Sequence, residues 1–265
     1  MNSEKKLTDS LLIMSNADYH ASPGMSSSGL KPLARSPAHY KAYKENGIAQ
    51  TANMRLGSAI HAMALESGSG VLQAPGSTRN TNLYKEFEKA HPGQILLLED
   101  EVDGARRAAD AVLKHPTARR LLTGGKPELS GFWNDPNTGV KCRFRPDYLR
   151  EDGVIVDLKS TSDASAQAFQ SAMSSFKYHW QTAWYLRGLS AISGRKELEF
   201  VHIVVETSAP FGVNVFAIDA PSLYKANEDI EKLLSIYAEA EHTGQWDSYP
   251  IGIQSLSIRP WEFQS

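Results

Sequence analysis

Cysteine is scarce in this sequence: Cys142 is the only one among 265 residues. One cysteine excludes an internal disulfide, a CxxC redox pair, a cysteine-rich zinc site and a four-cysteine iron–sulfur cluster. This scarcity favours a reducing compartment, so we expect a cytoplasmic protein.

Long apolar runs are also absent. The first apolar run, residues 11–14, is too short for the core of a signal peptide. No segment approaches the ~20 apolar residues that a membrane span needs. We therefore predict that no membrane is among the partners.

Neither sign of charge dominates, because the sequence has 28 Lys and Arg and 30 Asp and Glu, for a formal net charge of -2. A nucleic acid would have to be attracted by a local basic surface. The motifs GxxxxGK[ST] and GxGxxG do not occur, and Gly124-Gly125-Lys126 lacks the upstream glycine. The sequence thus shows no site for a nucleoside triphosphate or a dinucleotide.

The expected secondary structure changes near residue 125, from mainly helices to strands and helices. Serine N-caps, helix-opening prolines and apolar periodicity predict a mainly helical part at 1–125, with a loop at 68–82. Strands are expected at 128–135, 139–149, 153–160, 198–207 and 211–219, and helices at 163–194 and 221–246. We predict one domain, 1–265, of the α/β class. Its catalytic core, 126–265, would be a central mixed β-sheet flanked by helices.

One expected strand, GVIVDLKS at 153–160, has a polar end that suggests a site. Side chains alternate along a strand, so Asp157 and Lys159 face one side and the Leu158 carbonyl stays available as a ligand. The preceding segment ends in RPD and, if it pairs with this strand, brings Asp147 next to Asp157. Two carboxylates and a carbonyl suit Mg²⁺ or Mn²⁺. A lysine beside such an ion can orient a water molecule.

A plainer interpretation of the same residues is open at this point. Asp147 would cap a turn, and Asp157 and Lys159 would form an ion pair at a strand end. Short motifs often occur by chance, so the decision rests on whether other motifs accompany this one.

Several other motifs do accompany it. RPDYL and VIVDLKST resemble the two parts of the PD-(D/E)XK nuclease signature. LGSAIHAMALE, PELSGFW and HWQTAWY resemble the histidine helix, the glutamate strand and the Gln-x-x-x-Tyr motif of RecB-type members. The opening YHASPGMSSSGLKPLARSPAHY resembles the start of the RecE and exonuclease VIII nuclease domain. From about Tyr19 to Trp261, the chain resembles the RecE-like alkaline exonucleases, which are related to lambda exonuclease. The resemblance implies a restriction-endonuclease-like core.

The resemblance also implies a catalytic site with two Mg²⁺ ions, or Mn²⁺ in their place. The implied metal ligands are His61, Asp147, Asp157 and the backbone carbonyl of Leu158. Lys159 would position the attacking water, with Glu128, Gln181 and Tyr185 assisting at the metals or holding a phosphate. Read without the resemblance, His61 is a hydrogen-bonded core histidine and Glu128 an exposed strand acid. Trp180 and Trp184 are expected in the core.

Candidate contacts to DNA fall in two regions. Ser26 and Ser28 stand at a helix start, with Arg35 nearby in sequence, and could hold a 5′-terminal phosphate. The alternative is an ordinary N-cap, which needs only one serine. Arg143 and Arg145 share a strand face and could meet a phosphate backbone, or could be a solvated stripe.

The function implied by the resemblance is 5′→3′ digestion of double-stranded DNA ends, which leaves a 3′ single-stranded tail. It also implies a homotrimeric ring around the DNA and transfer of the tail to a single-strand annealing protein during recombination. Two other functions stay open: a PD-(D/E)XK endonuclease of the resolvase or restriction type, and a non-catalytic module that binds DNA ends.

Overall fold

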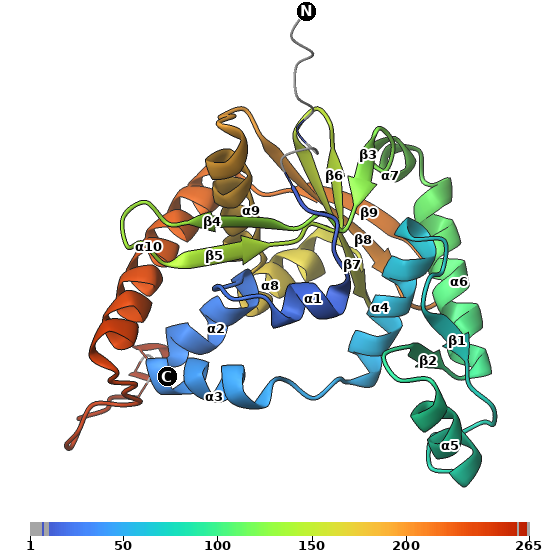
Figure 1. The fold of residues 1–265 in the computed structure, drawn as a ribbon, viewed down its shortest axis with the longest axis horizontal. Coiled ribbons are helices and arrows are strands. Elements are labelled where there is room, and N and C mark those ends of the chain that lie inside the picture. Colours follow the sequence, from blue (N-terminus) through green and yellow to red (C-terminus); the bar gives the residue numbers. More distant parts are fainter. Residues whose placement is uncertain (1–6, 8–10, 259, 264–265) are drawn as a thin grey trace, which may run out of the picture.

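The chain begins with four helices and continues with groups of strands and helices in the computed structural model, which describes residues 7, 11–258 and 260–263 (Figure 1). The helices are α1 (Asn16–Ala21), α2 (Ser27–Arg35), α3 (Pro37–Asn46), α4 (Ala52–Leu65), α5 (Asn82–Ala90), α6 (Glu99–Lys114), α7 (Pro116–Leu121), α8 (Ala166–Phe176), α9 (Tyr178–Ser193), α10 (Ala220–Thr243) and a 3₁₀ helix (Pro260–Phe263). The strands are β1 (Val71–Gln73), β2 (Ile95–Leu97), β3 (Gly125–Pro127), β4 (Gly131–Asn134), β5 (Lys141–Phe144), β6 (Tyr148–Arg150), β7 (Val154–Thr161), β8 (Glu199–Glu206) and β9 (Val213–Ala217). In the part of the chain described here, no helix combines the length and apolar character needed to cross a membrane.

The centre of the molecule is a five-stranded sheet with the order β3-β6-β7-β8-β9. Strands β7 and β8 are parallel, whereas the other neighbouring pairs are antiparallel. Parallel strands need a long crossover, and α8 and α9 supply it between β7 and β8. The predicted α/β class, with a central mixed sheet flanked by helices, is confirmed.

The central strand β7 is covered on both faces. Ile155 belongs to a cluster with Trp184 on α9 and Leu234 on α10. Val156 and Leu158 belong to a second cluster, formed with α4 and α6. A strand buried on both faces needs a near-continuous apolar run, and this need explains the run that the sequence shows before its polar end.

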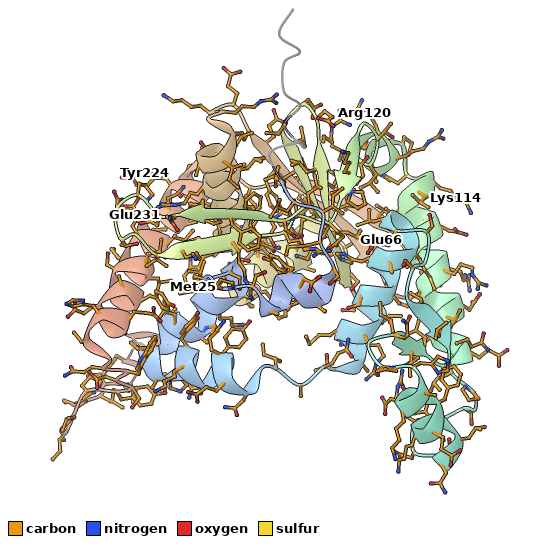
Figure 2. All side chains as sticks on the ribbon, viewed as in Figure 1. Met25, Glu66, Lys114, Arg120, Tyr224 and Glu231 are labelled. Carbon is orange, nitrogen blue, oxygen red and sulfur yellow. The ribbon has the colours of Figure 1, made fainter. Side chains whose placement is uncertain are left out.

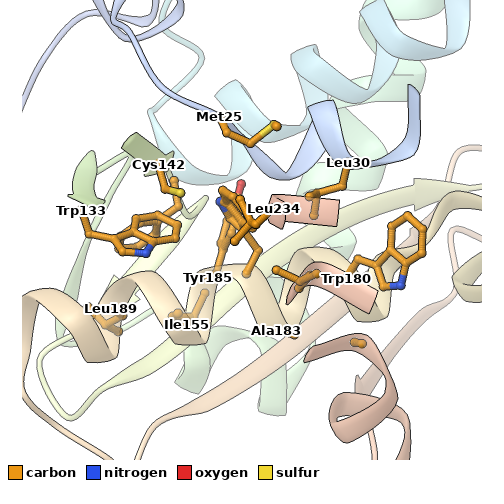
Figure 3. Packing of buried hydrophobic residues seen from close by; sticks show 14 of the residues in the cluster. Met25, Leu30, Trp133, Cys142, Ile155, Trp180, Ala183, Tyr185, Leu189 and Leu234 are labelled. Atoms are coloured by element: carbon orange, nitrogen blue, oxygen red, sulfur yellow. The ribbon is translucent and has the colours of Figure 1, made fainter. Parts of the chain in front are cut away.

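The N-terminal helices share the first of these clusters. Met25 and Leu30 lie in it together with Trp180 and Leu234, as Figure 3 shows. Trp184 is fully buried, and its indole N–H donates to the carbonyl of Arg143 at 2.9 Å. The two tryptophans of α9 are thus core residues, as predicted.

Local breaks in the chain follow the sequence signals closely. The hairpin β4–β5 joins the first two of the expected strands, and Pro116 separates α6 from α7. Segment 163–194 is two helices, separated by Lys177 at a left-handed φ of 62°. The prediction was wrong for 68–82, where β1 interrupts the expected loop and pairs with β2. Three-residue strands are too short to display a period of two.

Candidate active site

A groove of about 1420 Å³ runs along the C-terminal end of β7. Its walls come from the segment entering α1, the N-terminal half of α4, the region of α5 and β2, and the junction of α8 and α9. Glu66, directly after α4 (Figure 2), is on the wall as well. The predicted site residues that line the groove are His61, Glu128, Arg145, Leu158 and Lys159.

The pairing of β6 with β7 brings Asp147 to the polar end of β7. Tyr148 is paired with Val156 in an antiparallel register, which places the two aspartates side by side. The Leu158 N–H donates to Asp147 Oδ2 at 2.6 Å. Lys159 Nζ lies 2.7 Å from Asp157 Oδ2, on the same side of the strand. The predicted geometry of this strand pair is therefore confirmed.

His61 projects from α4 toward the same point. Its Nε2 is 2.5 Å from the Leu158 carbonyl oxygen, and its Nδ1 is 3.4 Å from Asp147 Oδ2. Burial lowers the pKa of His61, which favours the neutral ring that can act as a metal ligand. The histidine contacts a carbonyl and a carboxylate that were both predicted as metal ligands.

Asp157 is almost completely buried, with its side chain 1% exposed. Besides Lys159, it accepts from Gln181 Nε2 at 2.7 Å. His202 Nδ1 also lies 3.1 Å from Asp157 Oδ2, and Thr182 Oγ1 lies 3.0 Å from His202 Nε2. Three side chains from three elements therefore fix the direction of this carboxylate.

The partners His202 and Thr182 were not predicted from the sequence. His202 is opposite Asp157 in the parallel register of β7 and β8, and it is fully buried. The sequence does contain a signal for this contact, a lone histidine inside the apolar segment LEFVHIVVET. A buried polar side chain needs a hydrogen-bond partner, so such a histidine indicates a polar neighbour.

The charged side chains in this cluster shift one another's pKa values. Burial alone would raise the pKa of Asp157, but Lys159 and His202 hold it below its usual range. Burial and the nearby Asp157 raise the pKa of Asp147 well above its usual value. Burial opposes the charge of Lys159, yet the two aspartates outweigh it and raise the pKa of Lys159. Two carboxylates thus share one lysine, and the raised pKa of Asp147 means that this position favours a bound positive charge.

Glu128 departs from the prediction in its local structure. It lies between β3 and β4 rather than in a strand, at a left-handed φ of 53°. Its Oε2 is 2.5 Å from Arg145 Nε. Burial and Asp147 raise the pKa of Glu128, and Arg145 opposes them. Both side chains border the groove. The predicted contact of Arg145 with a phosphate backbone would therefore involve the ion pair of Arg145 and Glu128.

Tyr185 is not where a phosphate contact requires it. Its side chain is buried among Phe144 and Phe200, and the groove lining includes neither Tyr185 nor Gln181. This corrects the expectation that Tyr185 holds a phosphate. Gln181 acts on Asp157 instead.

Arg143 is a second correction. It is 6% exposed, and its guanidinium donates to the carbonyls of Tyr19, His20 and Ser22 at the end of α1. Its Cζ also lies 4.8 Å from the centre of the Tyr19 ring. The guanidinium of Arg143 is therefore buried and hydrogen-bonded within the protein, so it cannot contact a phosphate backbone.

The serine cluster and Arg35 lie at opposite ends of α2. Ser26 is the N-cap but makes no side-chain capping bond, and its Oγ is 2.9 Å from Ser28 Oγ. Arg35 is the last residue of this nine-residue helix and donates to Tyr249 Oη at 3.1 Å. A rise of about 1.5 Å per residue separates the two ends by roughly 12 Å. Arg35 therefore does not complete a pocket with these serines.

The donor set suits a divalent cation at its centre. Across residues 7, 11–258 and 260–263, no three His, Cys, Asp or Glu side chains are arranged to hold a metal ion by themselves. His61, Asp147 and the Leu158 carbonyl nevertheless contact one another, and they are nitrogen and oxygen donors of the kind that Mg²⁺ and Mn²⁺ accept. The raised pKa of Asp147 also favours a cation there. The full two-ion ligand set stays a prediction.

The fold and the placement of these residues define a PD-(D/E)XK nuclease-like core, as the motifs predicted. Residues 26–254 match the family described as "PDDEXK-like domain of unknown function (DUF3799)", and the chain belongs to this family. A search of curated proteins gave no significant match.

Three solved structures are similar to this chain to different degrees. A "Putative exonuclease" from Eubacterium rectale is 15% identical, with a TM-score of 0.65 over 96% of this chain and 99% of that one. A phage-related exonuclease from Haemophilus somnus 129PT is 15% identical, with a TM-score of 0.37 over 84% and 97%. An alkaline exonuclease from Laribacter hongkongensis is 14% identical, with a TM-score of 0.30 over 71% and 96%. Only the first of these likenesses, with its TM-score of 0.65, supports the fold.

Proposed function

We propose that this protein is a metal-dependent exodeoxyribonuclease that hydrolyses double-stranded DNA from an end. The observation that carries the proposal is the convergence of Asp147, Asp157 and Lys159 at the end of β7, where Lys159 borders the groove and His61 lies against the Leu158 carbonyl. Membership of the PDDEXK-like family supports phosphodiester hydrolysis, and the likeness to the Eubacterium rectale structure supports action on ends.

The residues of the site have separate roles in this proposal. Asp147, Asp157, the Leu158 carbonyl and His61 would hold Mg²⁺, or Mn²⁺, which when bound neutralises the scissile phosphate and the leaving 3′-oxygen. The Lys159 ammonium orients the attacking water and stabilises the charge that develops on the phosphate. Gln181 and His202 keep the Asp157 carboxylate in position.

The resemblance to RecE-like enzymes supports the finer part of the proposal. Digestion runs 5′→3′ and leaves a 3′ tail, which a single-strand annealing protein receives in recombination. The sequence has no nucleoside triphosphate motif, so a homotrimeric ring around the DNA, together with the free energy of hydrolysis, would supply processivity.

Digestion of defined DNA tests the activity and its polarity. Linear duplexes with a 5′-phosphate, a 5′-hydroxyl, or one end blocked are compared with a circular plasmid, with and without Mg²⁺. We expect Mg²⁺-dependent loss of the linear duplexes only, from the 5′ ends. Lys159→Ala should abolish digestion, whereas Lys126→Ala, an exposed lysine on β3, should digest normally. Cleavage of the circle would indicate an endonuclease, and unchanged digestion by Lys159→Ala would disprove the assigned role of Lys159.

A further inference from the structure

Aromatic rings form a column from the core to the wall of the groove. Phe216 stacks on Phe169 with ring centroids 4.8 Å apart and an interplanar angle of 9°. Phe169 stacks on Tyr178 at 5.8 Å and 23°, and Tyr178 on Phe176 at 5.6 Å and 23°. Phe169 is 6% exposed, whereas Phe176 is 60% exposed. The column is therefore anchored by the buried ring of Phe169, and its Phe176 end is open to solvent.

The junction of α8 and α9 presents the outer two rings to the groove. Phe176 and Tyr178 flank Lys177, which has a left-handed φ of 62°, a conformation that is unfavourable for a residue with a side chain. Both rings line the groove. Because Tyr178 rests on buried Phe169, the exposed ring of Phe176 is supported from behind.

Lysines accompany both outer rings. Lys159 Nζ, in the proposed active site, is 4.9 Å from the centre of the Tyr178 ring. Lys31 Nζ, on the exposed side chain of a residue in α2, is 5.4 Å from the centre of the Phe176 ring. The open end of the column thus combines a flat apolar face with an exposed positive charge, one ring away from the ring that Lys159 contacts.

We infer that Phe176 is a stacking platform for a nucleobase of the DNA, close to the phosphate that is cleaved. A base has a flat π-face that fits an exposed aromatic ring, and its phosphate fits the ammonium of Lys31, which can swing from the ring to the backbone. An uncharged apolar partner would match the ring but would not use the lysine. This inference rests on the proposed function, since it takes DNA as the ligand of the groove. Stacking uses a face that every base has, so the platform tolerates any sequence.

Fluorescent DNA tests the platform without requiring hydrolysis. Duplexes carrying 2-aminopurine at successive positions from one end are titrated with protein in Ca²⁺ instead of Mg²⁺. We expect one position to be quenched on binding, and Phe176→Ala to lose this quenching and to bind about tenfold more weakly. Phe176→Leu keeps an apolar side chain without a π-face and should lose the quenching, whereas Phe176→Trp should retain it.

The matched control is Tyr224→Ala, which removes another exposed aromatic ring, 69% exposed, on α10 and away from the groove (Figure 2). Its binding and quenching should equal those of the wild type. Equal quenching by the wild type and Phe176→Ala, or tight binding by both, would overturn the inference. Position-specific quenching that depends on Phe176, in a protein that never digests DNA, would uphold the platform and overturn only the proposed nuclease activity.

Discussion

Replacing His202 by phenylalanine tests the hydrogen-bonded support of Asp157. The histidine is fully buried between Asp157 and Thr182, and its ring packs near Phe200 and Phe169. Phenylalanine has a similar shape, so the change removes two hydrogen bonds and leaves little cavity. Any loss of stability then reports mainly on those bonds.

The expected loss of stability comes from Asp157 and Thr182, which each lose a hydrogen-bond partner. A hydrogen bond to a charged group contributes about 1.5–3 kcal/mol, and an unpaired buried hydroxyl costs about 1–3 kcal/mol. Thr182 is 1% exposed, so water cannot replace its partner. We expect His202→Phe to lower the free energy of unfolding by about 3–5 kcal/mol, measured by urea denaturation with an unchanged dependence on urea.

A double-mutant cycle with Thr182→Val separates the two bonds. Thr182→Val alone leaves His202 Nε2 unpaired, whereas the double variant has no unpaired hydroxyl, so its loss should be about 1 kcal/mol or more below the sum of the single losses. His242→Phe, at an exposed histidine near the end of α10, should change stability by less than about 0.5 kcal/mol. Strict additivity, or a loss under about 1 kcal/mol for His202→Phe, would refute the reasoning.

Two other substitutions test the rest of the framework. Burial opposes the charge of Asp135, but Thr138 and Arg187 together lower its pKa, so its stabilising effect should be present above the ordinary pKa of about 3.9 and fade as the pH falls through the lower folded value. Asp135→Asn should therefore destabilise the protein by about 1.5–3 kcal/mol at pH 7, and the difference from the wild type should shrink as the pH falls below the ordinary pKa, in urea unfolding at a series of pH values. Arg143→Met should cost about 2–4 kcal/mol because it removes the guanidinium that donates to the carbonyls at the end of α1, yet DNA binding measured by anisotropy in Ca²⁺ should match the wild type. Weaker binding by a stably folded Arg143→Met would contradict the interior role.

Apart from His61, which the motif resemblance supplied, the part of the site that the sequence predicted is the part determined by neighbouring strands. Asp147, Asp157 and Lys159 could be placed because strand alternation and the pairing of adjacent strands are local properties. His202 could not, because it meets Asp157 through a parallel register across 45 residues. The length of the crossover helices α8 and α9 does not determine which residue of β8 lies opposite Asp157.

Arg143 shows a different limit. Its position on an alternating strand suggested exposure, but the backbone around Met25 runs along β5, donating to Lys141 and accepting from Arg143 at 2.9 and 2.8 Å. This contact covers the strand with α1, more than 100 residues earlier in the chain. A solvated face and a covered face have the same alternation, so only the tertiary contact distinguishes them.

The support of Asp157 by β7, β8 and α9 has a consequence for heat inactivation. The helix α9 cannot shift on the sheet without releasing Gln181 from Asp157 and opening the core around Trp184. Catalytic competence and global folding should therefore fail in one cooperative step. An enzyme built this way retains its active geometry until it melts, and after cooling its activity should return only in proportion to the refolded fraction.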